Sequence, residues 1–157
     1  MPLTREGLVA HREATAGEPL HRHVWFFHAH VYFDPDHEAE ARALRARIGA
    51  ELAPGGHVQL DSIMPQPIGP HPVGNFEVLF TRDAFADVMT WFQFNRPAWM
   101  SILIHPCTEK MELDHSARAI WFGPQLVIDL TYPRLSDDKT AATGRSAVDA
   151  IDASKAH

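Results

Sequence analysis

Hydrophobic and polar positions along this chain fall into short blocks of two kinds. Blocks rich in aromatic and β-branched residues, with apolar positions alternating, predict strands, because strand side chains point to the two faces in turn. Blocks whose apolar positions recur every three or four residues predict helices. Strands are expected at 25–33, 57–63, 75–82, 100–105, 119–122 and 125–130, and helices at 36–52 and 83–95.

Proline and glycine separate these blocks. Pro54-Gly55-Gly56 ends the first helix, and the stretch 64–74 contains four prolines and two glycines. Because proline lacks a backbone N–H and fixes φ, this stretch predicts a stiff, extended loop rather than a helix or a central strand.

The first six elements follow the order βαββαβ, which is the split motif of ferredoxin-like folds. We therefore expect an α+β sandwich: an antiparallel sheet in the order 4-1-3-2, two helices on one face, and an extra C-terminal hairpin over 119–130. The opposite face is left open to solvent, a partner or a ligand. Residues 1–22 are interpreted as a polar lead-in with room for a short helix, 23–133 as the domain, and 134–157 as a polar tail.

Composition narrows the class of protein. A chain of 157 residues with a net charge of −6 and no basic run is ill suited to bind nucleic acid or an anionic membrane surface. Cys107 is the only cysteine, which excludes an internal disulfide and a cysteine-rich zinc site. No signal-peptide core and no long apolar span is present, so a soluble cytoplasmic protein is expected.

The 11 histidines suggest a site, because histidine is the commonest metal ligand and the usual proton carrier near neutral pH. Strand alternation places His28 and His30 on the open face of the first strand, Glu77 on that of the third, and His105 on that of the fourth. These strands are neighbours in the expected sheet, so the four side chains converge. The residues that alternate with them suit packing under the helices: Phe27, Ala29, Val31, Phe33, Phe76, Val78, Phe80, Ile102 and Ile104.

Two further histidines, His71 and His115, lie on loops that could reach this surface. Two imidazoles with one carboxylate form the arrangement of non-haem Fe(II) oxygenases, whereas three imidazoles with a water suit zinc. The ordinary alternatives are hydrogen-bonded structural histidines and a salt bridge between Glu77 and an arginine.

Other reactive or aromatic residues have plainer interpretations. Cys107 is disfavoured as a nucleophile because Pro106 interrupts the strand alternation that would bring it to His105. Core packing is the ordinary role of the large aromatic residues Trp91, Phe92, Trp99 and Trp121. The histidines outside the converging set are interpreted as surface residues: His11, His21, His23, His37 and His157.

Five short motifs resemble, in order and spacing, the DOPA 4,5-dioxygenase family over about residues 24–132. They are His28-Ala29-His30-Val31-Tyr32-Phe33, Ile68-Gly69-Pro70-His71-Pro72, Leu103-Ile104-His105-Pro106, Asp114-His115 and Trp121-Phe122-Gly123. The resemblance implies a small ferredoxin-like enzyme that performs extradiol cleavage of a catechol by O₂ with Fe(II). Fungal members of that family open DOPA.

The family's motif histidines correspond to His28, His30, His71, His105 and His115 here, and the chemistry of catechol cleavage suggests a role for each site residue. His30 and His105 are expected to bind Fe(II), or zinc as a substitute, with Glu77 as the anionic ligand. His28 and His71 are expected to be ligands or acid–base groups, and His115 to serve acid–base catalysis or catechol binding. The catechol ring would lie against three aromatic side chains: Phe26, Tyr32 and Trp121.

Two rival functions remain open. One is another histidine-ligated metalloenzyme, using zinc for hydrolytic or lyase chemistry. The other is a non-enzymatic ferredoxin-like module that forms a homodimer through the open face of its sheet and uses the same polar residues at the interface. On the dioxygenase interpretation the partners are a small catechol and O₂, and a homodimer is compatible with it.

Overall fold

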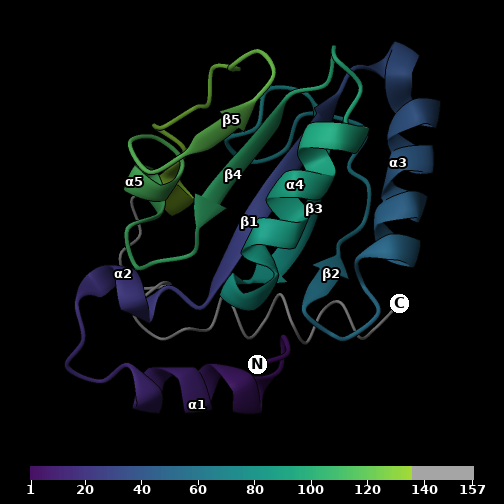
Figure 1. The fold of residues 1–157 in the computed structure, drawn as a ribbon. Coiled ribbons are helices and arrows are strands. Elements are labelled where there is room, and N and C mark those ends of the chain that lie inside the picture. Colours follow the sequence, from purple (N-terminus) through teal and green to yellow (C-terminus); the bar gives the residue numbers. More distant parts are fainter. Residues whose placement is uncertain (136–157) are drawn as a thin grey trace.

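The computed structural model describes residues 1–135, which contain one antiparallel sheet and several helices (Figure 1). The strands are β1 (Phe26–Phe33), β2 (Val58–Leu60), β3 (Gly74–Thr81), β4 (Ile102–Pro106) and β5 (Ile120–Phe122). The α-helices are α1 (Arg5–Ala14), α2 (Leu20–His23), α3 (Glu38–Glu51), α4 (Phe85–Asn95) and α5 (Met111–Asp114). Short 3-10 turns occupy Pro35–His37, Arg82–Ala84 and Pro133–Leu135.

The strand order is β2-β3-β1-β4-β5, and every pair is antiparallel. Without β5, this is the expected ferredoxin-like order, so the predicted α+β fold is confirmed. The register sets His30 opposite Glu77 on β3, and His28 opposite His105 on β4. The central strand therefore carries two histidines, and each faces a polar partner on a neighbouring strand.

Helices α3 and α4 cover one face of the sheet, and in Figure 1 α4 lies across β1 and β3. Alternate residues of β1, β3 and β4 pack against them, as the alternation predicts. The buried members of this core are Ala29, Val31, Phe33, Ala41, Leu44, Ile48, Val58, Phe76, Val78, Phe80, Val88, Phe92, Met100, Ile102 and Ile104.

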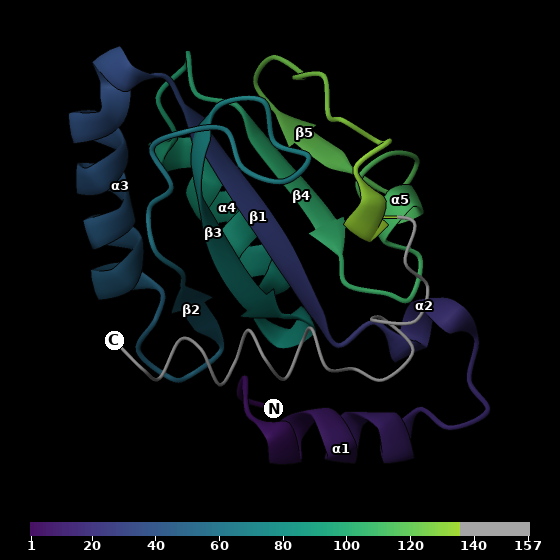
Figure 2. The ribbon, with the colours of Figure 1, turned by 180° about the vertical axis from the view of Figure 1, so that it is seen from behind.

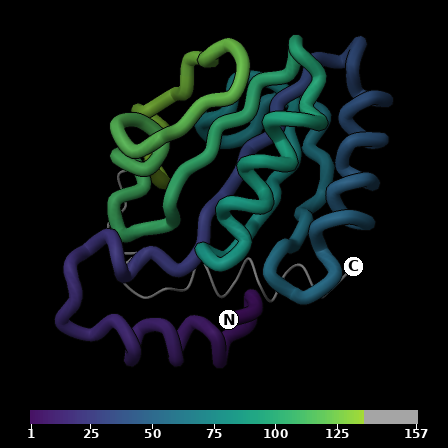
Figure 3. The backbone as a smooth tube through the Cα atoms, viewed as in Figure 1, coloured from purple at the N-terminus to yellow at the C-terminus, as the bar shows by residue number. Residues whose placement is uncertain are grey.

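The N-terminal segment packs against the opposite face. Leu3 and Leu8 form a second buried cluster with Trp25, Phe26 and Leu79, two of which come from the open face of β1 and β3. Figure 3 shows this segment running beneath the lower end of the sheet before the chain enters β1. Part of the face expected to be open is therefore covered by the chain itself.

Two local expectations were wrong. Residues 125–130 form no strand, because the chain leaves the sheet there and crosses the proline-rich loop, where the Asp129 N–H donates to the Pro70 carbonyl at 3.0 Å. The C-terminal hairpin is thus reduced to the single strand β5. His11 is buried rather than on the surface, because its Nε2–H donates to the Arg22 carbonyl at 3.0 Å and ties α1 to α2.

The proline-rich loop between β2 and β3 crosses the face of the sheet that is turned away from α3 and α4 (Figure 2). Its first half is tied to β3 by reciprocal backbone hydrogen bonds between Met64 and Asn75, each 2.8 Å long. This loop and α5 flank the histidine-bearing part of β1. Within residues 1–135, no helix is long and apolar enough to cross a membrane.

Candidate metal centre and its cavity

Three strand histidines meet on the face of the sheet away from α3 and α4. The ring centroid of His28 lies 5.9 Å from that of His30 and 5.3 Å from that of His105. Nε2 of His30 lies 3.1 Å from Nε2 of His105. His30 and His105 are buried, and His28 is partly buried. The predicted convergence of these side chains therefore occurs, and the register of β1 with β4 produces it.

Two loop histidines complete the cluster. The ring of His71, from the proline-rich loop, lies 4.0 Å from that of His30. The ring of His115, which follows α5 directly, lies 4.1 Å from that of His105. Both are buried. All five motif histidines thus form one cluster, drawn from two strands and two connections far apart in the sequence.

Hydrogen bonds determine which ring nitrogens face the cluster. Nδ1–H of His105 donates to the Pro106 carbonyl at 2.8 Å, and Nδ1–H of His115 donates to the Met111 carbonyl at 2.9 Å. A neutral imidazole has a single N–H, so Nε2 of each ring retains its lone pair. Nδ1 of His71 lies 2.8 Å from the Tyr32 hydroxyl.

Burial keeps these rings neutral. Desolvation lowers the pKa of all five histidines, well below 6.5 for His30 and His105 and to about 3 for His71. The neighbouring histidines lower the pKa of His30 further, because a second positive charge in the cluster is unfavourable. Neutral imidazole is the form that binds metal ions.

Two groups of three histidines, within the part of the chain that the structure describes, could each hold a metal ion. One is His28, His30 and His105, and the other is His30, His71 and His115. The ligand atoms of each group lie within 4.8 Å of one another. His30 belongs to both groups, so it is the shared centre of the cluster.

Glu77, the expected anionic ligand, belongs to neither of these groups. Its carboxylate oxygens lie 3.5 Å from Nδ1 of His30 and 3.9 Å from Nδ1 of His28. The pairing of Glu77 directly across from His30 accounts for this position. The carboxylate approaches the ring from the side opposite the Nε2 atom that faces His105.

The protonation of His30 tests whether this cluster fits a metal. A single proton on Nε2 makes the hydrogen bond to Nε2 of His105 at 3.1 Å, but it leaves the Nδ1 lone pair facing the Glu77 carboxylate at 3.5 Å. A proton on Nδ1 instead leaves two Nε2 lone pairs, those of His30 and His105, only 3.1 Å apart. A doubly protonated ring is disfavoured by the lowered pKa. A metal cation bound by the two Nε2 atoms removes the conflict, so the donor set fits one.

The histidines line a cavity of about 570 Å³. Phe26 lies in its wall, as expected. Two other expected wall residues lie outside it: Tyr32 is buried behind His71, and Trp121 stacks on Tyr32 with 5.9 Å between ring centroids. The remaining apolar lining residues are Met64, Ile68, Pro70, Met111 and Leu135.

The C-terminal boundary of the domain lies later than expected. Tyr132, Arg134 and Leu135 line the cavity, and Leu135 is 3 % exposed, so the first two residues of the expected tail belong to the cavity wall. The apolar pair Tyr132 and Leu135, within an otherwise polar stretch, was the sequence signal for this. The rest of the expected tail lies outside the described residues.

Cys107 also lines the cavity. Burial, and then the nearby Asp114 and Glu77 carboxylates, raise the pKa of its thiol well above the ordinary value. The thiol form therefore dominates at neutral pH, and it is a poor nucleophile.

Comparison with known proteins gives consistent matches. The profile of the Dopa 4,5-dioxygenase family matches residues 27–132. The chain is 34 % identical over 122 residues to DOPA 4,5-dioxygenase of Amanita muscaria, which covers 72 % of this chain and 51 % of that protein. It is 39 % identical over 127 residues to an uncharacterised 21.2 kDa protein of Botryotinia fuckeliana, which covers 73 % of this chain and 67 % of that one. The matched region thus spans about half the length of the Amanita enzyme.

A crystal structure of a candidate dioxygenase from Nostoc punctiforme has a similar fold, with a TM-score of 0.65 and 36 % sequence identity. The match covers 71 % of this chain and 92 % of that one.

Proposed function

This chain belongs to the Dopa 4,5-dioxygenase family, and we propose that it is an oxidoreductase that opens the ring of a catechol, DOPA or a related compound, with O₂ at a non-haem Fe(II) centre. The observation that carries the proposal is the cluster of five neutral histidines on the floor of the cavity. Family membership supports the dioxygenase activity, and the cluster supports the metal.

His30 would hold the metal in either three-histidine arrangement, together with His28 and His105 or with His71 and His115. When bound, Fe(II) brings the catechol oxygens and O₂ together and lets electron density pass between them. Both oxygen atoms enter the product across the broken carbon–carbon bond, so the ring is oxidised, O₂ is reduced, and no net proton is consumed.

Where His30, His71 and His115 hold the metal, His28 is left free and suits the role of the proton acceptor. Its Nε2 is buried without a hydrogen-bond partner among residues 1–135, and its ring lines the cavity. Burial lowers its pKa, so the ring is neutral and free to accept a proton from a catechol hydroxyl. The Glu77 carboxylate, 3.9 Å from Nδ1, would stabilise the imidazolium that forms. His28 would then return the proton to the opened product.

The walls suit an aromatic substrate. Apolar atoms make up most of the lining surface, although many lining residues are polar, and a volume of about 570 Å³ lies within the usual range of about 300–1,000 Å³ for small-molecule sites. Phe26 offers a ring face beside the histidines, at the end of the cavity formed by the start of β1.

A zinc enzyme is the second candidate, and the position of Glu77 favours it. With that carboxylate outside both groups, a set of three neutral histidines also matches zinc sites that activate a water molecule. The two candidates differ in whether O₂ is consumed and in the metal that supports activity.

The test is O₂ uptake by protein loaded anaerobically with Fe(II), using DOPA and a panel of catechols, while absorbance follows the ring-opened product. We expect uptake with Fe(II), none with Zn²⁺, and loss of uptake and of bound iron in His30→Ala. His21→Ala, which changes an exposed histidine on α2, is the matched control and should behave as wild type. Iron binding without uptake for any catechol would refute the dioxygenase proposal and favour the zinc enzyme.

A further inference from the structure

Asp114 is a buried carboxylate that the proposed reaction does not use. It is 1 % exposed, and within residues 1–135 it is the one buried side chain among the aspartates, glutamates, lysines and arginines. A buried charge is costly unless it is paired and hydrogen-bonded. The presence of this buried carboxylate beside the histidine cluster therefore needs an explanation.

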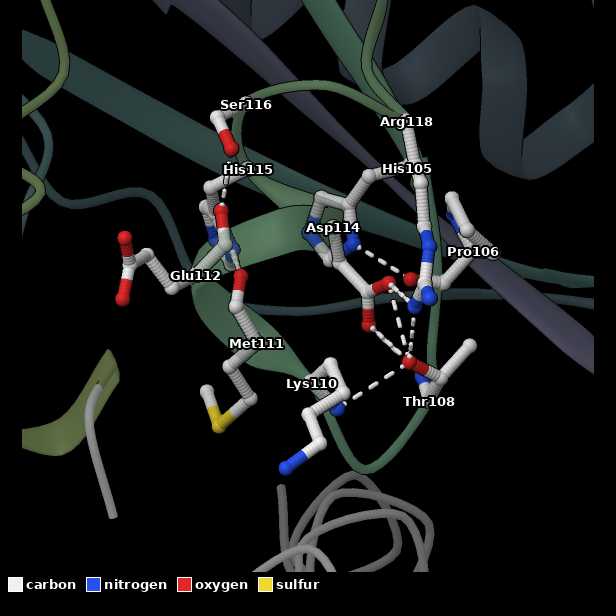
Figure 4. Close-up of polar contacts among 10 residues, drawn as sticks. All are labelled: His105, Pro106, Thr108, Lys110, Met111, Glu112, Asp114, His115, Ser116 and Arg118. Atoms are coloured by element: carbon white, nitrogen blue, oxygen red, sulfur yellow. Dashed lines mark hydrogen bonds and ion pairs between the residues drawn. The ribbon is translucent and has the colours of Figure 1, made fainter. Parts of the chain in front are cut away.

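The carboxylate is held by a closed set of contacts, which Figure 4 shows. It accepts hydrogen bonds from the Thr108 backbone N–H at 2.8 Å, from the Thr108 hydroxyl at 2.9 Å and from Nη1–H of Arg118 at 2.9 Å. Nη1–H of Arg118 also donates to the Thr108 hydroxyl oxygen at 2.8 Å. Each of the three side chains therefore contacts the other two.

These three residues come from the segments that position two of the histidines. Thr108 follows the end of β4, three residues after His105. Asp114 ends α5 and immediately precedes His115. Arg118 lies between His115 and β5, and its backbone N–H donates to the Leu113 carbonyl at 2.9 Å. The Asp114 contacts thus join the end of the His105 strand to the turn that carries His115.

The backbone hydrogen bonds of this turn are local to it: the His115 N–H donates to the Met111 carbonyl at 3.0 Å and the Ser116 N–H to the Leu113 carbonyl at 3.2 Å. Helix α5 contains only four residues, and so short a helix is not stable by itself. The His115 ring is oriented by one hydrogen bond, from Nδ1–H to the Met111 carbonyl at the start of that helix. Its position 4.1 Å from the His105 ring consequently depends on how firmly α5 is attached to β4.

We infer that Asp114, with Thr108 and Arg118, is a positioning residue that fixes His115 against His105 and thereby assembles the metal centre. It touches neither ring in a hydrogen bond and acts through the backbone of α5. The expected effect of Asp114 on metal affinity rests on the proposed metal site. Its expected effect on the position of the His115 ring does not.

The test compares Asp114→Asn and Thr108→Val with two matched controls. Thr108→Ser keeps the hydroxyl that bridges Asp114 and Arg118, and Glu112→Gln removes an exposed carboxylate from the same helix. Co²⁺ is the probe, because its visible spectrum reports histidine ligation. We expect the two test variants to bind Co²⁺ about 10- to 100-fold more weakly, the range found for residues that support metal ligands. Both controls should bind as wild type does.

A second measurement reports which nitrogen of the His115 ring carries the proton in the metal-free protein. Nitrogen-15 spectra of the histidine rings should show His115 of the wild type and both controls as the Nδ1–H tautomer, and a mixture of tautomers in the test variants. Should Asp114→Asn fail to fold, Thr108→Val carries the comparison, with circular dichroism confirming that it is folded at the working temperature.

The two readouts separate the two hypotheses. Test variants that are less stable, but bind Co²⁺ normally and retain the His115 tautomer, would show a purely structural carboxylate and overturn the inference. Wild-type protein that binds no Co²⁺ would overturn the proposed metal centre. The ring-nitrogen spectra would then decide the positioning role by themselves.

Discussion

At the scale of single residues, the position of Glu77 bears on the protonation of His30. Without a metal, Nε2–H of His30 donates to Nε2 of His105 at 3.1 Å, whereas a metal on Nε2 would shift the proton to Nδ1, which faces the Glu77 carboxylate at 3.5 Å. A carboxylate behind a metal-binding imidazole orients the ring and increases its basicity. In the proposed metal centre Glu77 would therefore orient His30 from the side of Nδ1.

We expect Glu77→Gln to weaken divalent metal binding by about tenfold, because the amide accepts a hydrogen bond but lacks the negative charge that favours Nδ1–H. Isothermal titration with Co²⁺ measures the affinity. Glu13→Gln, on the exposed side of α1, is the control. Complete loss of binding would instead place the Glu77 carboxylate in the coordination sphere, as the sequence analysis expected.

At the scale of elements, the cluster depends on connections as much as on strands. The proline-rich loop carries His71 beside His30, and the turn after α5 carries His115 beside His105. The turn after β5 is equally constrained. Gly123 has φ of 72°, and a Cβ at this position would lie 2.6 Å from the carbonyl oxygen of Met100, two residues before β4.

Gly123→Ala should lower the free energy of unfolding by about 1–3 kcal/mol, because it combines a left-handed backbone with a steric overlap. Gly17→Ala is a matched control: Gly17 has φ of 82°, but no atom lies within 4 Å of the place that a methyl group would occupy, so only the backbone cost of about 1 kcal/mol applies. Urea unfolding measures both. Equal losses in the two variants would mean that the β4–β5 connection relaxes around the methyl group.

At the scale of the whole molecule, the two faces of the sheet are covered differently. One face carries an apolar core under α3 and α4. The other carries the histidine cluster, flanked by the second apolar cluster of the N-terminal segment. The folded protein thus encloses five neutral histidines, four buried and His28 partly buried, that are fully hydrated in the unfolded chain, and this makes its stability depend on pH.

The metal-free protein should lose stability as the pH falls below about 6.5. Unfolded histidines bind protons there, whereas the folded ones, whose pKa values are lowered, do not. The stabilisation is fully present above pH 6.5 and declines towards the folded pKa, about 3 for His71, by up to about 1.4 kcal/mol per pH unit for each histidine.

Urea unfolding in EDTA at pH 7.5, 6.5 and 5.5 measures how steeply the free energy of unfolding changes with pH. His71→Asn should reduce this slope by the contribution of one histidine. A free energy of unfolding that is the same at pH 5.5 and pH 7.5 would contradict the neutral, buried state of the cluster.

The sequence by itself determined the βαββαβ order of the central elements, the apolar face of the sheet and the grouping of His28, His30 and His105 on the other face. Alternation along β1 and the βαββαβ order depend on local periodicity, which a sequence displays directly. This is why Val31 and Ile104 were assigned to the core, and His28, His30 and His105 to the other face.

Only the tertiary structure decided how those side chains are used. The register of β1 with β3 places Glu77, the expected anionic ligand, beside Nδ1 of His30. The path of the chain after Gly123 replaced an expected strand with a crossing over the proline-rich loop, and it brought Tyr132 and Leu135 into the cavity wall while Trp121 stayed outside. Packing likewise buried His11 and the N-terminal leucines. These outcomes depend on contacts between residues that are far apart in the chain, and local sequence patterns do not encode such contacts.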